Sequence, residues 1–177
     1  MKLGLAERLL AQDPARAKAA ISELKGDADE ALETLRDLAR GIYPPLLAER
    51  GLAAALESQA RKATIPVRVE ADEVRRYPQE VEAALYFCCL EALQNVAKYA
   101  DASSARITLE GSADRLTCSI SDDGHGFDSR TVARGSGLQN MADRMEALGG
   151  SATVQSAPGK GASVVVSVPV LALEMSA

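Results

Sequence analysis

Three short stretches in the second half of this 177-residue chain carry the side chains that could do chemistry. In the first, residues 91–99, Glu91 and Asn95 stand four positions apart, so on a helix they share one face with Lys98. An amide oxygen is a hard, neutral ligand of the kind that Mg²⁺ accepts, and a carboxylate one turn away can orient or deprotonate an attacking group. Taken alone, the pattern is more typical of an ordinary amphipathic helix with a solvated face.

The second stretch, residues 122–127, reads Asp-Asp-Gly-His-Gly-Phe and directly follows an alternating apolar segment. Gly124 and Gly126 would let the backbone approach a flat ligand. The carboxylate of Asp122 can accept a hydrogen bond from an exocyclic amine such as that of adenine. A plain aspartate–glycine turn is the alternative, because this pattern by itself is common.

The third stretch, Gly135-Ser136-Gly137-Leu138, opens an expected helix. Backbone N–H groups at a glycine-rich helix start form a natural phosphate site, which the helix dipole strengthens. It is not a Walker loop, because no G-K-[S/T] follows. It is not a Rossmann fingerprint either, because no strand leads directly into it and the G-x-x-G spacing is missing. The alternative is a glycine N-terminus of a surface helix.

Composition narrows the class of protein. The chain is 47% hydrophobic and 25% charged, which is typical of a soluble globular protein, and only 3% aromatic, which disfavours a surface for stacking bases. A net charge of −5 and the absence of any Lys/Arg run disfavour direct nucleic-acid binding. No stretch approaches the roughly 18 apolar residues that span a bilayer, and the first residues do not resemble a signal peptide. We therefore expect no membrane segment and a cytoplasmic location.

Hydrophobic periodicity predicts the elements that must position the three stretches. Apolar side chains that step by three or four over residues 21–42 predict a long helix whose stripe needs a partner. The Tyr43-Pro44-Pro45 break ends that helix. We therefore expect two domains, a helical hairpin over 1–45 and a second domain over 46–177.

Within 46–177, helices and strands mix without a regular βαβ rhythm, which favours an α+β fold with a two-layer α/β sandwich. The patterns predict helices near 49–62, 78–100 and 138–148, and strands near 65–70, 105–109, 116–120, 151–155 and 162–168. Three cysteines, Cys88, Cys89 and Cys118, lack metal-ligand spacing and are expected to be reduced core residues.

Taken together, in this order and followed by Pro158-Gly159-Lys160-Gly161, the three stretches resemble the ATP-binding domain of sensor histidine kinases and of gyrase-type and MutL-type ATPases, the GHKL type. The segments 35–47 and 51–56 are similar to the junction between dimerisation helix and catalytic domain in NarL/DesK-type kinases. The resemblance covers nearly the whole chain. It implies an ATP-dependent protein-histidine kinase region of a two-component system.

The resemblance also implies a role for each site residue. Asn95 would coordinate Mg²⁺ on the triphosphate of ATP, Glu91 would help orient or deprotonate the attacking group, and Lys98 would touch phosphate. Residues 127–134 would form a mobile lid. The residues expected to hold the nucleotide are Asp122 at the adenine amino group, Gly124 and Gly126 beside the base, and Gly135, Gly137 and Leu138 at the phosphate end.

The sequence also departs from that family. Its one histidine, His125, stands between glycines in the second stretch and is misplaced as a phosphoryl acceptor. By the resemblance, a short helix over 3–11 corresponds to the tail of the first dimerisation helix. We therefore expect a fragment truncated after the acceptor, which binds ATP without phosphorylating itself. Tyr99 and Ala162 replace residues that are commonly His and Thr or Ser, so nucleotide affinity is expected to be reduced.

The implied partners are a response regulator and a second copy of the chain, which would dimerise through the N-terminal helices. A protein-serine kinase of the anti-sigma type is one alternative, since it shares the nucleotide fold. A non-catalytic nucleotide-binding or dimerisation module is another. The long apolar helix favours the histidine kinase over the serine kinase, because such a stripe builds a dimeric bundle. Retention of Glu91, Asn95 and Asp122 argues against a decayed site.

Overall fold

A computed structural model describes residues 44–71, 74–112, 114–128 and 136–170, together with Lys18 and Ile21. The chain divides into two compact units, Met1–Tyr43 and Pro44–Ala177. The described ranges fall almost wholly in the second unit. Apart from isolated positions and its last two residues, the hairpin predicted over 1–45 lies outside the described residues.

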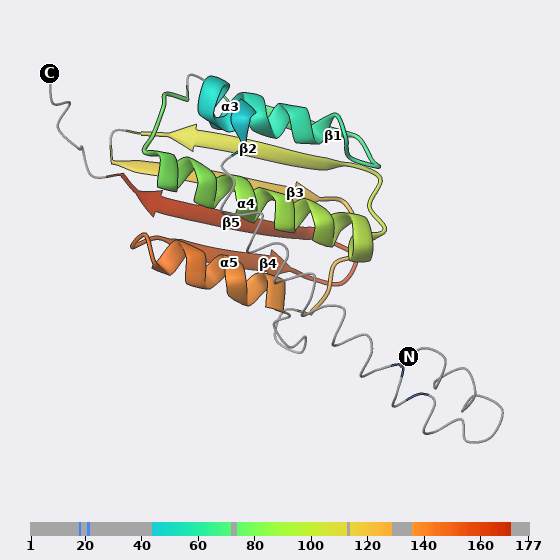
Figure 1. Ribbon diagram of the computed structural model, residues 1–177. Helices are drawn as coiled ribbons and strands as arrows, with labels where there is room; N and C mark the ends of the chain where they lie inside the picture. The colour runs from blue at the N-terminus through green and yellow to red at the C-terminus, as the bar shows by residue number, and fades with distance from the viewer. Residues whose placement is uncertain are drawn as a thin grey trace, which may run out of the picture. The chain divides into compact units, whose positions relative to one another are not determined.

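The second unit is built on a five-stranded sheet of order β1-β2-β3-β5-β4 (Figure 1). The strands are β1 (Val67–Ala71), β2 (Ala105–Gly111), β3 (Arg115–Asp122), β4 (Ser151–Ser156) and β5 (Ala162–Pro169). β1 and β2 pair in parallel, and the other neighbours are antiparallel. Because a parallel pair needs a long crossover, the chain runs through a helix between β1 and β2. That helix carries the first chemical stretch.

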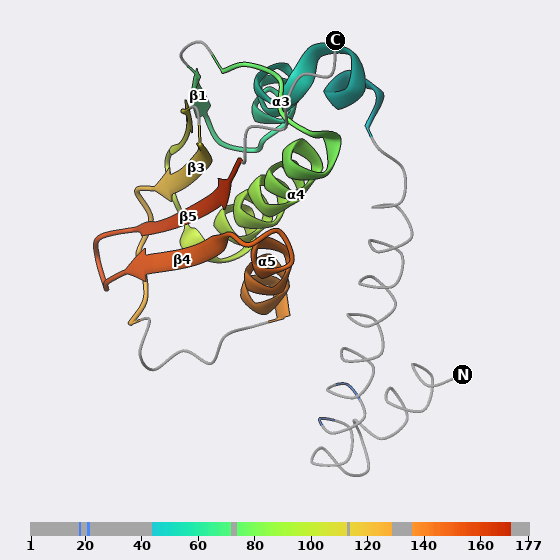
Figure 2. The ribbon, with the colours of Figure 1, turned by 90° about the vertical axis from the view of Figure 1, so that its left-hand side faces the viewer.

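Three helices lie on one face of the sheet, α3 (Pro45–Ala60), α4 (Gln79–Asn95) and α5 (Ser136–Glu146), as Figure 2 shows. A five-residue π-helix, η1 (Val96–Ala100), continues α4. This arrangement confirms the predicted α+β two-layer sandwich.

Strand alternation and helix periodicity together build the core between the two layers. On β2, Ile107 and Leu109 are buried whereas Arg106 is exposed, as period-two alternation requires. From α4, a buried stripe that includes Leu85 and Ala92 packs toward the sheet. Each such large apolar side chain contributes about 1.5–3 kcal/mol when fully buried. The sheet therefore fixes α4, and with it the polar face of that helix.

The start of α3 differs from the sequence prediction. The prolines at 44 and 45 indicated a break, yet Pro45 is the first residue of α3, where the missing N–H costs nothing. Gly51 then kinks the helix with φ 79° and ψ −179°, a backbone conformation that favours glycine. The kink lets Leu47 and Leu52, on either side of it, both be buried.

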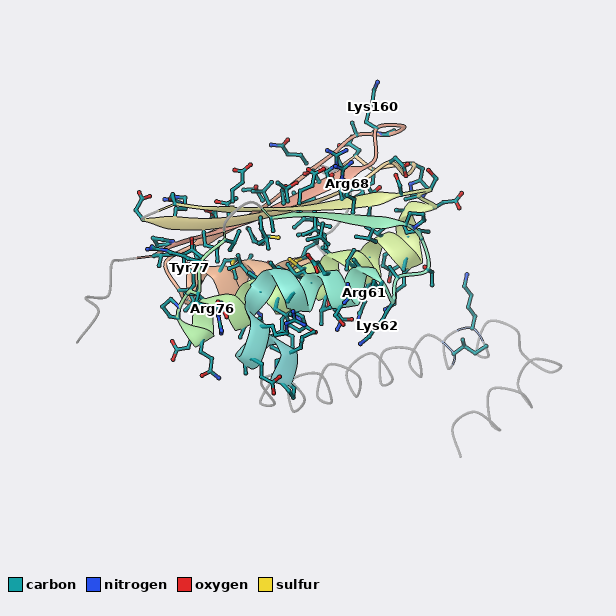
Figure 3. All side chains as sticks on the ribbon, turned by 90° about the horizontal axis from the view of Figure 1, so that it is seen from above. Arg61, Lys62, Arg68, Arg76, Tyr77 and Lys160 are labelled. Carbon is teal, nitrogen blue, oxygen red and sulfur yellow. The ribbon has the colours of Figure 1, made fainter. Side chains whose placement is uncertain are left out.

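An ion pair between the buried carboxylate of Glu82 and the exposed side chain of Arg76 joins the first turn of α3 to α4. The carboxylate of Glu82, which is 0% exposed, accepts hydrogen bonds from Arg76 Nε at 2.9 Å, Arg76 Nη2 at 3.0 Å and the Tyr77 N–H at 3.0 Å. The same guanidinium donates to the carbonyls of Ala48 at 3.1 Å and Leu47 at 3.3 Å. Figure 3 shows Arg76 and Tyr77 on the helix side of the sheet. One side chain thus ties two helices together.

Candidate functional site

The first and third chemical stretches meet where α4 faces the start of α5. Glu91 is half-buried on α4, and its carboxylate occupies the space in which a side chain at Gly137 would lie. A Cβ at Gly137 would stand 3.1 Å from the Glu91 carboxyl carbon and closer still to Oε1. The glycine therefore lets the first turn of α5 come up against the carboxylate. Leu138, the next residue, is half-buried.

The first stretch ends in the π-helix rather than in regular α-helix. Asn95, half-buried, is the last residue of α4, and Lys98 and Tyr99 lie exposed on η1. The sequence analysis assumed α-helical spacing through Lys98. A π-turn bonds i to i+5, so Lys98 does not keep the register with Glu91 and Asn95 that was assumed. Single π-turns of this kind are frequent at functional sites.

The second stretch leaves the end of β3 and folds back on η1. Asp122, half-buried, accepts a hydrogen bond at Oδ1 from the Gly124 N–H at 2.9 Å. Gly124 is buried against the last residue of η1, since a Cβ there would stand 2.9 Å from the Ala100 Cβ and closer to its carbonyl oxygen. The Ala100 carbonyl in turn accepts the His125 N–H at 2.9 Å. The helix with the amide and the strand with the carboxylate therefore meet at this edge.

The turn between β4 and β5 closes the other side of this loop. Gly126 has φ 61°, and a Cβ there would meet the carbonyls of Ala157 and Gly161. The Ser156 hydroxyl accepts the Phe127 N–H at 2.9 Å and donates to the Gly161 carbonyl at 2.8 Å. The Gly159 N–H donates to the His125 carbonyl at 2.6 Å. The glycines at 124 and 126 thus serve close backbone packing.

Gly161 borders Asp122 directly. It has φ 67°, and a Cβ there would run into the Asp122 carbonyl and stand 3.3 Å from Oδ1. The absent side chain therefore lets the turn pack directly against Asp122. Lys160, one residue earlier, extends away from the helices at the tip of the turn (Figure 3).

Asp123 is the residue that sequence reasoning missed. Although exposed, its carboxylate accepts four hydrogen bonds of 2.6–2.9 Å, from the backbone N–H and the hydroxyl of both Ser103 and Ser104. The Ser103 hydroxyl, followed by the N–H and hydroxyl groups of Ser104, holds the pKa of this carboxyl well below its usual range. The partners lie 19 and 20 positions away, so no local pattern could have indicated them.

The predicted site residues thus form two joined groups. Glu91 meets Gly137, while Asp122, Gly124 and Gly126 form one loop that packs on η1 directly after Asn95. Gly135 and residues 129–134 of the predicted lid lie outside the described residues.

A surface cavity of about 390 Å³ shares one wall with this site. Arg68 and Arg106 line it, and they alternate with the helix-facing residues of their strands, so it opens mainly on the sheet face away from the helices (Figure 3). Of the predicted site residues it includes Asp122 alone. The other lining residues are Pro66, Ser104, Ala105, Ser121 and Asp123.

A magnesium ion carried by a nucleotide fits the donor set here. Within the described ranges, no group of three or more His, Cys, Asp or Glu side chains could hold a metal ion. Mg²⁺ does not need such a group, because it typically takes one or two protein oxygens together with substrate phosphates and water. The Asn95 amide is an oxygen donor of that kind, and the Glu91 carboxylate lies one turn earlier on the same helix. None of the described helices is long and apolar enough to cross a membrane.

Comparisons with known proteins bear on both parts of the chain. Residues 80–172 match the family described as histidine kinase-, DNA gyrase B-, and HSP90-like ATPase, and residues 1–47 match a histidine kinase family. An uncharacterized sensor-like histidine kinase of Chloroflexus aurantiacus is 33% identical over 184 residues, covering 96% of this chain and 31% of the relative. The signal transduction histidine-protein kinase/phosphatase DegS of Brevibacillus brevis is 36% identical over 96 residues, covering 54% of this chain and 25% of the relative.

Solved structures show the same fold. The blue-light activated histidine kinase EL346 of Erythrobacter litoralis superimposes with a TM-score of 0.59 at 24% identity, covering 67% of this chain and 42% of that one. The histidine kinase domain of the same protein gives a TM-score of 0.52 at 25% identity, covering 67% of this chain and 57% of that one. The chain spans about a third and a quarter of the length of the two curated relatives.

The chain belongs to the histidine kinase-, DNA gyrase B-, and HSP90-like ATPases. Within that family, the match of its first 47 residues and the sensor kinase relatives identify it as a region of a NarL/DesK-type histidine kinase. This confirms the family and the GHKL fold predicted from the sequence. ATP binding follows from the family.

Proposed function

We propose that the second unit binds ATP with Mg²⁺ where α4, the end of β3 and the start of α5 meet. The protein to which the chain belongs would pass the γ-phosphoryl group to a histidine outside this sequence. The observation that carries the proposal is the Ala100 carbonyl, which accepts the His125 N–H and packs against Gly124. The contact joins the segment that follows Asn95 to the segment that follows Asp122. It therefore supports one shared site for the Asn95 amide and the Asp122 carboxylate.

In this proposal Asp122 recognises the base. Its Oδ1 is already oriented by the Gly124 N–H, so the carboxylate has a fixed direction from which to accept the adenine amino group. The glycine at 161 lets the turn between β4 and β5 pack directly against this residue. Gly124 and Gly126 hold the adjoining backbone close to η1 and to the same turn, and the flat base would approach beside this compact loop.

At the phosphate end, Asn95 would ligate the metal and Glu91 would orient or deprotonate the attacking group. When bound, Mg²⁺ would neutralise the charge on the triphosphate. The contact of Glu91 with Gly137 supports a carboxylate held beside the start of α5. That helix start would offer backbone N–H groups to phosphate, and Gly135 and Leu138 are the neighbouring residues in the sequence that we propose take part. Lys98, exposed on η1, would reach phosphate from the other end of the first stretch.

For the whole protein we propose a cytoplasmic catalytic domain over 46–177 and a dimerisation hairpin over 1–45. Dimerisation would use the apolar stripe of residues 21–42. The histidine acceptor would relay phosphate to the aspartate of a response regulator. The match of residues 1–47 to a histidine kinase family favours this assignment over the protein-serine kinase alternative.

Calorimetric titration of the chain with ATP, with and without Mg²⁺, tests the proposal. We expect Mg²⁺ to strengthen binding in the wild type, and Asn95→Ala to lose most of that Mg²⁺ dependence. The neighbouring exposed amide provides the control, Gln94→Ala, which should behave as wild type. A silent titration of the wild type would favour the non-catalytic module.

The absence of an acceptor is tested separately. With γ-labelled ATP, this chain alone should incorporate no label, because its single histidine lies in the nucleotide loop. Label that is stable to base and labile to acid would contradict the acceptor assignment while leaving the nucleotide site in place.

A further inference from the structure

Two buried thiols face each other between α4 and β3. The sulfurs of Cys89 and Cys118 lie 3.1 Å apart, and both side chains are completely buried. All three cysteines are free thiols in the structure. A buried cysteine ordinarily behaves as a small apolar side chain. At 3.1 Å the two thiols are in direct contact, and either one can donate its S–H to the other, so each sulfur is the other's immediate neighbour.

The pair lies between the two elements that carry the site. Cys89 precedes Glu91 by two residues on α4, and Cys118 precedes Asp122 by four residues on β3. A covalent link there would join the helix that holds the amide and carboxylate to the strand that leads into the second stretch. The sulfurs would have to close by about 1 Å to reach a disulfide bond length of about 2.05 Å.

The environment makes these thiols slow to react in the closed structure. The contact with Cys118, followed by burial, raises the pKa of the Cys89 thiol well above its ordinary value, so the nucleophilic thiolate is scarce. Reaction therefore needs transient opening of the contact between α4 and β3. Local openings of this kind occur in folded domains well below the cost of global unfolding.

We propose that Cys89 and Cys118 form a reversible intramolecular disulfide by exchange with a small organic disulfide of the glutathione type. In the first step the thiolate of one cysteine attacks the small disulfide, forms a mixed disulfide and expels one glutathione thiolate. In the second step the other cysteine, as its thiolate, attacks the protein sulfur of the mixed disulfide and expels the second glutathione. The protein loses two protons and two electrons, and one glutathione disulfide becomes two glutathione thiols.

The test is a titration of the whole chain in buffers of graded glutathione disulfide to glutathione ratio. Each sample is incubated both without urea and at a urea concentration just below the unfolding transition, then quenched by alkylation. We expect a species lighter by about 2 Da, for the two hydrogens lost, that the alkylating agent does not modify and that dithiothreitol reverses. Non-reducing peptide mapping should link the peptide of Cys118 to the one that contains Cys88 and Cys89.

Variants separate the two adjacent cysteines. Cys88→Ser should form the link at the same glutathione ratio as the wild type, whereas Cys89→Ser and Cys118→Ser should form none. A link that survives in Cys89→Ser would overturn the assignment, as would a wild type that stays fully reduced at every ratio with and without urea. The mapping does not involve nucleotide, so its failure leaves the proposed ATP site untouched.

Discussion

Two carboxylates in this domain each gather several hydrogen-bond donors, in opposite surroundings. Glu82 is completely buried and receives three N–H groups from Arg76 and Tyr77. Asp123 is exposed and receives the N–H and hydroxyl groups of Ser103 and Ser104. The two carboxylates accept similar numbers of hydrogen bonds. Water can take the place of the protein donors only at Asp123, because that carboxylate is exposed.

This difference in surroundings gives the two carboxylates different roles, one in the stability of the fold and the other in the positioning of a loop. Losing the charge of Glu82 weakens the hydrogen bonds that hold the Arg76 guanidinium between α3 and α4, so the stability of the whole domain should fall. Losing the charge of Asp123 frees the loop between η1 and β2 from the end of β3, next to Asp122. The buried carboxylate therefore maintains the fold, and the exposed one maintains the geometry of the candidate site.

The largest expected effect is at the buried carboxylate. Glu82→Gln should lower the free energy of unfolding by about 2–4 kcal/mol, because the buried side chain loses its charge-assisted hydrogen bonds and turns an amide donor toward the N–H groups of Arg76. Urea denaturation measures this. Glu80→Gln, an exposed carboxylate in the same first turn of α4, is the control and should change stability by less than about 1 kcal/mol. Equal changes in the free energy of unfolding for the two variants would contradict the stabilising role of the Glu82 carboxylate.

Two glycines in the turn between β4 and β5 allow a second comparison of stability with site geometry. Gly159 and Gly161 both have positive φ, of 74° and 67°, but only Gly161 lies against Asp122, while nothing stands within 4 Å of a Cβ at Gly159. Gly159→Ala should cost about 1–2 kcal/mol of backbone strain and leave ATP affinity unchanged.

Gly161→Ala adds a clash with the Asp122 carbonyl to the same strain. It should cost about 1–3 kcal/mol more than Gly159→Ala and weaken ATP binding. Urea denaturation and calorimetry on both variants measure the difference. Identical behaviour of the two alanines would show that the close contact of Gly161 with Asp122 has no role.

The smallest effect on stability is expected at the exposed carboxylate. Asp123→Ala should leave the unfolding midpoint nearly unchanged and weaken ATP binding severalfold, because the loop beside Asp122 loses its anchor. Asp114→Ala, which removes another exposed carboxylate bonded to a serine, should leave ATP affinity as in the wild type. Calorimetric affinities decide between these outcomes.

The pH dependence of that effect follows from the pKa of Asp123. Because this pKa is depressed in the folded state, the contribution of the carboxylate is fully present above the ordinary aspartate value of about 3.9 and is lost only as pH falls through the lower folded value. The ratio of wild-type to Asp123→Ala affinity should therefore stay constant as the pH is lowered from about 7 to about 4, where an ordinary aspartate would be half protonated. A ratio that falls toward one between about pH 5 and pH 4 would mean that Asp123 titrates normally.

Local sequence patterns predicted most of the strands and helices, because buried side chains recur along each element with the period of that element. The runs 105–109 and 116–120 correspond to β2 and β3, and 162–168 corresponds to β5, each within one or two residues at its ends. The prediction failed where backbone chemistry departs from the average. Pro45 was interpreted as part of a break although it begins α3, and the helix predicted through Ala100 changes to a π-helix after Asn95.

The contacts that organise the site could not be predicted from one sequence because they join distant positions. Asp123 meets serines 19 and 20 positions away, and Cys89 meets Cys118 29 positions away. The meeting of Glu91 with Gly137 depends on how α5 packs against α4. The three stretches could be found because their side chains are chemically unusual together. Their order indicated the family, and the fold supplied the distances.

Selectivity for the base tests the nucleotide site most directly. By calorimetry with Mg²⁺, the wild type should bind ATP about tenfold or more tightly than inosine triphosphate, which lacks the exocyclic amine that Asp122 would accept. Asp122→Asn should lose that preference while keeping the wild-type circular dichroism spectrum. Equal affinity of the wild type for both nucleotides, or a preference that Asp122→Asn retains, would contradict the account.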